Sequence, residues 1–166
     1  MNKPSRRAFT LIELMVVITI IGILVAILLP VIGAVFTSGE KAQARTEVMG
    51  LEAALRKYYD DYNKFPPGTG EPRQEASESL ARLLSGVNEA GNNSREKMYM
   101  EFKPSSIASG KFIDPWGKPY LVSTDTNLDG ANGTGNVRRR VLVWSSGPDG
   151  LESGSSGEAK DNVASW

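Results

Sequence analysis

The sequence predicts an α+β protein in which one long N-terminal helix packs on a small antiparallel β-sheet head with loops. Three observations favour this class. No charged residue lies between Glu13 and Glu40, an amphipathic helical pattern follows as far as Tyr62, and short apolar runs then alternate with turns rich in Gly, Pro and Asn. Of the 166 residues, roughly 100 are left for a single compact head.

Residues 9–36 form an apolar run that is long enough to cross a membrane. As a helix it would measure roughly 40 Å at about 1.5 Å per residue, against a hydrocarbon core of about 30 Å. Three cations precede it, at Lys3, Arg6 and Arg7, whereas the charges of Glu40 and Lys41 cancel after it. The positive-inside rule therefore predicts a single span with a cytoplasmic N-terminus and with residues 37–166 outside.

One carboxylate, Glu13, lies five residues into the apolar run. An acid at mid-bilayer costs about 2.5–3.5 kcal/mol on insertion scales and less near an interface. Two interpretations follow. Glu13 can extend toward the headgroups from the cytoplasmic edge of the membrane, or it can form an ion pair with a positively charged partner.

The segment Arg6-Arg7-Ala8 followed by Phe9-Thr10-Leu11-Ile12-Glu13-Leu14 resembles the class III signal sequence of type IV pilins and type II secretion pseudopilins. The resemblance implies that a prepilin peptidase removes residues 1–8, cutting between Ala8 and Phe9, and methylates the new amine of Phe9. Ala8 stands where the family usually has Gly. In this family Glu13 of one subunit would neutralise the Phe9 amine of its neighbour, which fixes the register of assembly.

Composition argues against other classes. The formal net charge is zero, so nothing indicates nucleic-acid binding, and the basic run 138–140 is interpreted as a solvated turn or strand edge. The chain has no Cys and no His. We expect no disulfide and, with no recognisable nucleophile–base arrangement, no enzymatic activity.

Residues 37–62 are predicted to continue the helix as an amphipathic segment. Apolar residues follow four- and three-residue steps along one stripe, at Ala44, Val48, Leu51, Leu55, Tyr58 and Tyr62. Only the head, residues 63–166, can bury this stripe. Pro66 and Pro67 predict the end of the helix shortly before them.

Within the head, residues 71–74 are predicted to be a loop and residues 77–84 a short helix with Leu80, Leu83 and Leu84 inward. Residues 98–102 are predicted to form a strand or an extended segment. Residues 120–123 and 137–145 are predicted to pair as a hairpin, and the second strand is apolar on both faces.

The segment Asp125-Thr126-Asn127-Leu128-Asp129-Gly130 lies between the two predicted strands of this hairpin. It matches the first half of a calcium loop, with Asp125, Asn127 and Asp129 as candidate ligands of a second, weak site. The twelfth position is Asn136 rather than Glu. A polar turn without metal has the same composition, so both interpretations stay open.

The segment Asp114-Pro115-Trp116-Gly117-Lys118-Pro119-Tyr120 predicts a tight turn with a Trp that covers the core. It also resembles the D-P-W-G-x-P-Y segment of the major pseudopilins of type II secretion.

The C-terminal loop, residues 145–166, offers oxygen ligands at both of its ends, on Asp149, Asp161 and Asn162, and Val163 and Trp166 are expected to dock back on the head. The loop resembles the calcium loop of the major pseudopilins. That resemblance implies side-chain ligands from Asp149, Asp161 and Asn162, and carbonyl ligands from Ser146 and Leu151. Asn162 stands where the family has a second Asp, which removes one negative charge. An ion would close a long loop that no disulfide closes, whereas a turn closed without metal is the alternative.

Taken together, the resemblance implies a pilin-like pseudopilin of the bacterial inner membrane with a periplasmic head. It implies prepilin peptidase, minor pseudopilins and an inner-membrane assembly platform as partners, and a homopolymer that drives protein export. Two alternatives remain: a type IV pilin for adhesion, motility or DNA uptake, and a membrane-anchored binding module that does not polymerise.

Overall fold

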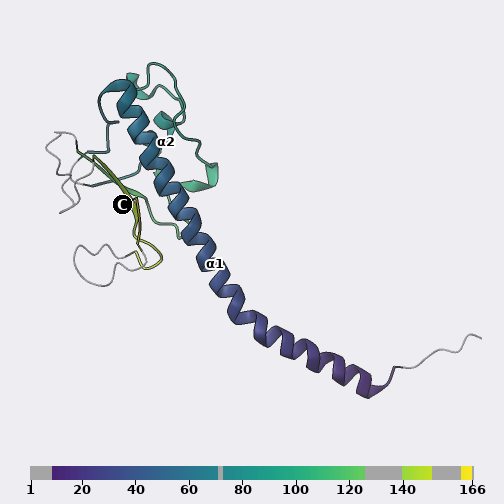
Figure 1. Ribbon diagram of the computed structural model, residues 1–166. Coiled ribbons are helices and arrows are strands. Elements are labelled where there is room, and N and C mark those ends of the chain that lie inside the picture. Colours follow the sequence, from purple (N-terminus) through teal and green to yellow (C-terminus); the bar gives the residue numbers. More distant parts are fainter. Residues whose placement is uncertain (1–8, 71–72, 126–139, 151–161, 166) are drawn as a thin grey trace, which may run out of the picture. The chain divides into compact units, whose positions relative to one another are not determined.

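The computed structural model describes residues 9–70, 73–125, 140–150 and 162–165, apart from the side chains of residues 30–34. Its internal contacts divide the chain into two units, Met1–Gly39 and Glu40–Trp166. One helix, α1 (Leu11–Tyr62), runs through residues of both. The remaining elements belong to the second unit, and Figure 1 shows α2 and the sheet along the C-terminal half of α1. The predicted α+β class is confirmed.

The second unit contains one further α-helix, two short 3-10 turns and six strands among the described residues. They are β1 (Gln74–Glu75), α2 (Glu78–Leu84), η1 (Glu89–Gly91), η2 (Pro104–Ser106), β2 (Ile107–Ala108), β3 (Lys111–Phe112), β4 (Leu121–Thr124), β5 (Val141–Ser145) and β6 (Val163–Ala164). One sheet has the order β1-β4-β5-β6 and the other pairs β2 with β3. Every pairing within them is antiparallel.

The predicted apolar stripe of α1 forms the centre of the head. Tyr62, the last member of the stripe, is half-buried. The five other members are fully buried: Ala44, Val48, Leu51, Leu55 and Tyr58. All of them except Ala44 share one core cluster with Leu80, Leu83 and Leu84 of α2 and with Phe112, Val122 and Val143 of the strands. Because these contacts cover one face of α1 only, the opposite face of the same helix stays exposed.

Backbone and side-chain hydrogen bonds stabilise the C-terminal end of α1. Asn63 adopts a left-handed conformation (φ 51°) and its N–H donates to the Tyr59 carbonyl at 2.7 Å, which is a common way for a helix to end. Asp61 accepts hydrogen bonds from Lys97 Nζ at 2.6 Å and from the Tyr99 hydroxyl at 2.8 Å. These two bonds hold the pKa of the Asp61 carboxyl below its usual value.

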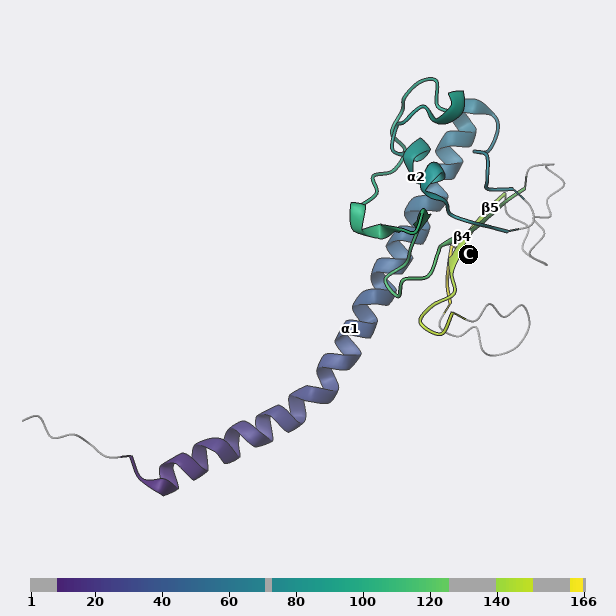
Figure 2. The same cartoon turned by 180° about the vertical axis from the view of Figure 1, so that it is seen from behind.

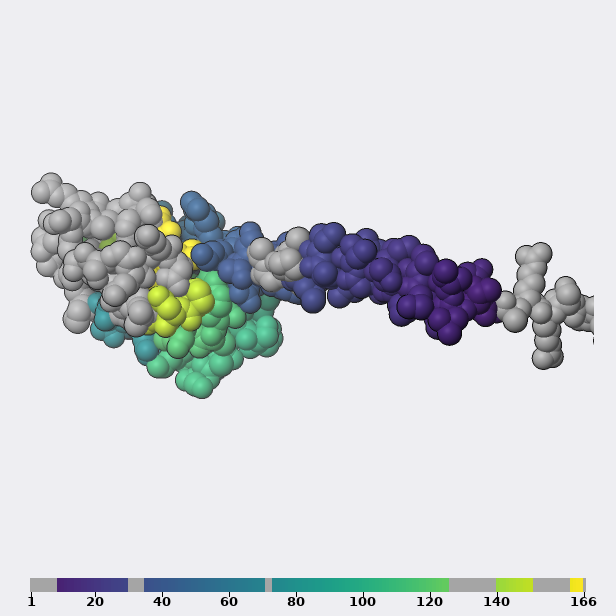
Figure 3. Space-filling view, turned by 90° about the horizontal axis from the view of Figure 1, so that it is seen from below, coloured from purple at the N-terminus to yellow at the C-terminus, as the bar shows by residue number. Residues whose placement is uncertain are grey.

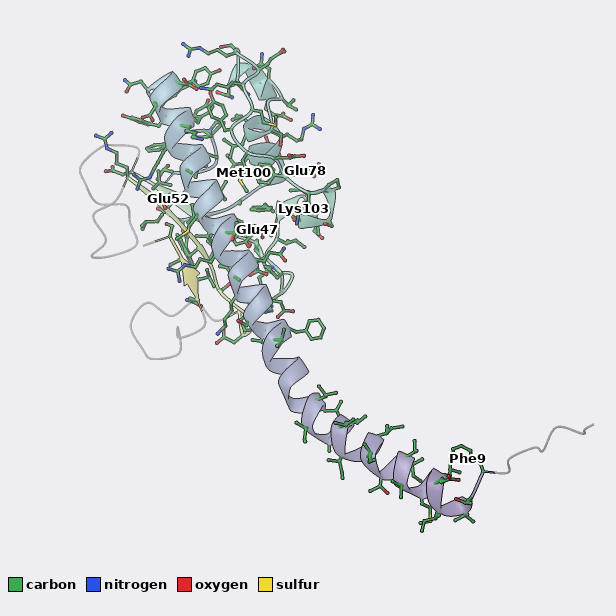
Figure 4. The ribbon with its side chains drawn as sticks, turned by 45° about the vertical axis from the view of Figure 1, so that its right-hand side comes forward. Phe9, Glu47, Glu52, Glu78, Met100 and Lys103 are labelled. Carbon is green, nitrogen blue, oxygen red and sulfur yellow. The ribbon has the colours of Figure 1, made fainter. Side chains whose placement is uncertain are left out.

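The predicted short helix is confirmed as α2. Ser77 caps its N-terminus, since its Oγ accepts from the Leu80 N–H at 3.2 Å. Leu80, Leu83 and Leu84 point inward as predicted. Residues 98–102 belong to no strand, and Met100 among them packs over Gly50 of α1, beside the helix in Figure 4.

The predicted hairpin is confirmed for β4 and β5, paired from Leu121↔Trp144 to Thr124↔Val141; residues 137–139 of its predicted second strand lie outside the described residues. Its two faces enter different clusters: Val122, Val141 and Val143 join the main core, whereas Leu121, Leu142 and Trp144 form a second cluster with Ala164 of β6. Both faces of the pair are therefore covered, as the continuous apolar run of β5 predicted. Figure 2 shows β4 and β5 side by side from behind.

The predicted loop over residues 71–74 is wrong at Gln74. Gln74 and Glu75 form β1, which pairs with Val122 and Leu121 of β4. Both β1 side chains are exposed, so the pairing rests on backbone bonds at the sheet edge and leaves no apolar pattern in the sequence. The short hairpin β2–β3 was likewise not predicted.

Candidate functional site

The segment predicted to be processed and to direct assembly begins at Phe9, whose side chain is 77% exposed; Ala8 and the rest of the predicted leader lie outside the described residues. Thr10 caps α1. The Thr10 N–H and Thr10 Oγ1 both donate to Glu13 Oε2 at 2.8 Å, and Thr10 Oγ1 accepts from the Glu13 N–H at 3.3 Å. Thr10 and Glu13 thus form a capping box, in which the carboxylate satisfies the otherwise unbonded start of the helix.

The capping box gives Glu13 a function that the sequence analysis did not predict. Its signature, Thr-x-x-Glu before an apolar run, was present in the sequence. Both bonds from Thr10 fall on Oε2, so within the described part of the chain Oε1 can still accept a donor from outside. A carboxylate with one oxygen bonded to its own helix and one open is suited to a neighbouring cation.

The apolar span is uncovered along its length. Leu11–Leu29, 19 residues, is long and apolar enough to cross a membrane, and none of it is buried. The exposed fractions of its large apolar side chains run from 46% at Val17 and Val25 to 75% at Leu11. Figure 3 shows them as a continuous surface on the face in view. Apolar surface of this extent indicates contact with lipid or with another chain.

The segment 114–120 forms the predicted tight turn around a buried carboxylate. Asp114 is 3% exposed; its Oδ1 accepts from the N–H groups of Trp116 at 3.0 Å and Lys118 at 2.8 Å. Gly117 supplies the left-handed conformation (φ 82°) that the turn requires. Asp114 Oδ2 accepts from the Ser145 hydroxyl at 2.5 Å, and Ser145 Oγ accepts from the Gly147 N–H at 3.0 Å.

Two aromatic side chains of this turn bind acids of α1 that are seven residues apart. Trp116 Nε1 donates to Glu40 at 2.9 Å, and the Tyr120 hydroxyl donates to Glu47 at 2.6 Å. Burial of Tyr120 and its bond to Glu47 raise the pKa of its hydroxyl, which stays protonated as the donor. The sequence predicted a Trp that covers the core, but Trp116 packs on neither core cluster of the described residues. Its partner Glu40 was not predicted, because a contact 76 residues away in the chain has no local signal.

Replacing Trp116 by Phe should lower the free energy of unfolding of the head by about 1 kcal/mol, since it removes one hydrogen bond to a partly exposed carboxylate. Urea unfolding followed by the fluorescence of Trp144 and Trp166 measures this. In combination with Glu40→Ala, Trp116→Phe should add almost nothing, because the bond is already absent. Full additivity of the two losses would contradict the contact.

The C-terminal loop supplies part of the predicted calcium ligands. Ser146 is buried and Asp149 is exposed, on a turn in which the Gly150 N–H donates to the Gly147 carbonyl at 3.3 Å. Val163 of β6 packs against the core, as expected; Asp161, Leu151 and Trp166 lie outside the described residues. The described residues alone contain no group of three or more acidic side chains that could hold a metal.

One observation fits the predicted ion. The Oδ1 atom of Asn162 is shielded from solvent and accepts no hydrogen bond from any described residue, and a buried oxygen without a donor is suited to a cation. A second observation argues for a weaker affinity for the ion, because a positive charge lies nearby. Lys118 lies directly over Gly150, where an added Cβ would come within 3.2 Å of Lys118 Nζ. Of the second predicted site, Asp125 is buried, and Asn127 and Asp129 lie outside the described residues.

The comparisons with known proteins agree with this arrangement. The prokaryotic N-terminal methylation motif matches residues 3–29. A prepilin-like N-terminus on an α+β head defines the class of pilin-like proteins, to which the architecture corresponds.

Several curated relatives of this chain share one name. "Type II secretion system core protein G" of Pseudomonas aeruginosa is 29% identical over 166 residues, covering 100% of this chain and 99% of that protein. The proteins of the same name from Aeromonas hydrophila (27% identical, 100% and 96% covered) and Klebsiella pneumoniae (27%, 97% and 94%) are similar along the same length. The chain is thus similar to proteins with this name over nearly the whole of their length. No solved structure matches it significantly.

Proposed function

We propose that this protein is a pseudopilin subunit of a type II secretion system, which polymerises through residues 9–36 into a short filament that drives protein export. The observation that carries the proposal is its similarity to the core proteins G over the whole chain, together with the methylation motif at residues 3–29. The exposed span Leu11–Leu29 supplies the surface that such a filament buries.

The proposal includes processing and place. A prepilin peptidase removes residues 1–8 before Phe9 and methylates its amine. The precursor resides in the bacterial inner membrane with its N-terminus in the cytoplasm and its head in the periplasm. Copies of this chain, minor pseudopilins and an inner-membrane assembly platform are its partners, and it has no catalytic role and no nucleic-acid partner.

Complementation tests this function. The gene is expressed in a bacterium that lacks its own core protein G, and the exported protein is measured outside the cell. Restored export, together with an intact mass that shows loss of residues 1–8 and gain of one methyl group, supports the proposal. A cleaved and methylated protein that gives surface pili but no export would favour a type IV pilin, and an uncleaved protein would favour a membrane-anchored binding module.

We also propose that the C-terminal loop binds one calcium ion through Asp149, Asp161 and Asn162 and the carbonyls of Ser146 and Leu151. The donorless Oδ1 of Asn162 supports this. A weaker second site would use Asp125, Asn127 and Asp129. A bound ion would hold the two ends of the loop together, and so would stabilise the head.

Removal of calcium should therefore lower the urea midpoint of the head. Relative to a calcium concentration 100 times the dissociation constant, removal of the ion should lower the free energy of unfolding by about 2.7 kcal/mol. Tryptophan fluorescence with calcium, with a chelator and with magnesium as the control measures it, and Asp161→Asn should abolish the difference. Lys118→Ala should enlarge it. Coincident curves with and without calcium would contradict the calcium site.

A further inference from the structure

Few large apolar side chains are exposed on the described part of the head. After Glu40 they are Met49 (48% exposed), Val87 (40%) and Met98 (63%). Val87 and Met98 are close in space, since an added Cβ at the neighbouring Gly86 would lie 3.6 Å from the Met98 nitrogen. Met49 belongs to α1. The head therefore presents two separate apolar features.

The first feature is the outer stripe of α1, which we define as Ala42, Thr46, Met49 and Ala53. These residues follow steps of four, three and four along the helix, so they share one face, and all four are exposed. The Thr46 hydroxyl donates to the Ala42 carbonyl at 3.0 Å, so it needs no partner from water. The stripe thus offers one flexible apolar side chain among small residues, which lets another surface approach closely.

The second feature is a groove of about 460 Å³ between α2 and the segment around β2, which we call the α2 groove. Its apolar lining comes from Ala81, Val87, Phe102, Pro104 and Ile107. Glu78 at the start of α2 borders it, on the side that also carries Lys103 in Figure 4. The stripe and the groove are made by different residues of the same chain.

We propose that the α2 groove of one subunit receives the outer stripe of α1 from a second copy of this chain, with Met49 entering the groove. This inference rests on the proposed function, because it assigns a contact between the heads of the filament. A contact between two different surfaces of identical chains does not close as a two-fold dimer; it extends into a helical polymer when its rotation does not close a ring. The outer stripe and the span proposed to form the filament core belong to the same helix, α1.

The charges beside the two surfaces are complementary. Lys41 and Arg45, next to the outer stripe, are exposed and form no ion pair with any described residue. At the groove, Arg82 is already paired with Glu89, whereas Glu78 forms no such pair within the described chain. Among the residues that line the groove, Glu78 and Arg82 carry a charge, and the pairing of Arg82 with Glu89 leaves Glu78 available to a cation from another chain. Arg45 of one copy can therefore face Glu78 of the next.

Engineered thiols test the contact, because the natural chain has no Cys. Met49→Cys and Val87→Cys are made singly and together in the full chain, and filaments assembled with the processing and assembly proteins are oxidised. Both positions are exposed, so the variants should fold. The double variant should give a ladder of cross-linked species, and each single variant at most a weak dimer. Met49→Cys with Lys64→Cys, an exposed position that does not line the groove, is the matched control.

Electron microscopy of the same samples separates the two proposals. Filaments without a ladder from the Met49→Cys, Val87→Cys variant overturn this contact and leave the pseudopilin function intact. A strong dimer from Met49→Cys alone, or cross-linking of Val87→Cys to a different protein, also overturns it. Absence of filaments from the natural chain overturns the proposed function and this contact with it.

Charge reversal provides an independent readout. Arg45→Glu and Glu78→Arg should each lower the amount of ladder by about 2- to 5-fold, as expected for an exposed ion pair. The two reversals together should restore it. Equal loss in the single and the combined variants contradicts the pairing of Arg45 with Glu78.

Discussion

Glu13→Ala should abolish filament formation while leaving the protein cleaved and in the membrane. The variant loses the carboxylate that, in the proposed filament, neutralises the Phe9 amine of a neighbouring subunit at low dielectric. An uncompensated charge of this kind costs about 3–5 kcal/mol when its partner is removed. Cross-linking of cells that co-express a prepilin peptidase measures the effect: the natural chain should give ladders and Glu13→Ala should remain monomeric.

Two variants distinguish the two contributions of Glu13, which are its ion pair with the neighbouring subunit and its cap on its own helix. Thr10→Ala removes the hydroxyl of the capping box but keeps the carboxylate, and it should cost about 1 kcal/mol of helix stability with assembly retained. Glu13→Gln keeps a hydrogen-bond acceptor for Thr10 and loses the charge, so it should fail to assemble. If Glu13→Gln assembles as the natural chain does, the charge is not required and Glu13 serves only as a cap.

Asp114→Ala should destabilise the head by about 3–5 kcal/mol. The carboxylate is buried and accepts from Trp116, Lys118 and Ser145, and each buried donor left without a partner costs about 1–3 kcal/mol. The loss should also loosen the Gly147 turn, whose N–H donates to the same Ser145 hydroxyl. Urea unfolding measures it by tryptophan fluorescence, because all three Trp residues belong to the head.

Asp114→Asn is the matched control. Its amide oxygen can still accept from the two N–H groups of the turn, and its NH₂ can donate to a rotated Ser145 hydroxyl. We expect a loss of about 1 kcal/mol. Equal losses from Asn and Ala would show that the charge itself, rather than the geometry of its bonds, stabilises the turn.

The sequence predicted the long helix and the β4–β5 pair because both carry a local periodic pattern. The stripe from Ala44 to Tyr58 repeats every three or four residues, and β5 is apolar on both faces. The edge strand β1 and the hairpin β2–β3 have two residues per strand. The partner of β1 lies far along the chain, whereas β2 and β3 pair with each other in a short hairpin. Strands of two residues are too short to show a periodicity that identifies them.

For the candidate site, the residues were predicted from the sequence, whereas several of their partners were not. Phe9 and Glu13 were selected because they match a family motif. That motif assigns Glu13 a partner in another subunit, so the bond between Thr10 and Glu13 within one chain was not predicted. The turn at Asp114 was predicted from its Gly and Pro residues. Its connections to Glu40, Glu47 and Ser145 arise only when the head packs on α1, so they required the structure.

The central claim is that this chain polymerises through its N-terminal span, and electron microscopy of sheared, purified filaments tests it most directly. The natural chain is co-expressed with a prepilin peptidase and the assembly proteins of a type II secretion system, with Glu13→Ala beside it. We predict filaments composed of the chain without residues 1–8, and none from Glu13→Ala. A natural chain that is cleaved before Phe9 and present in the membrane, yet forms no filament, would contradict the account.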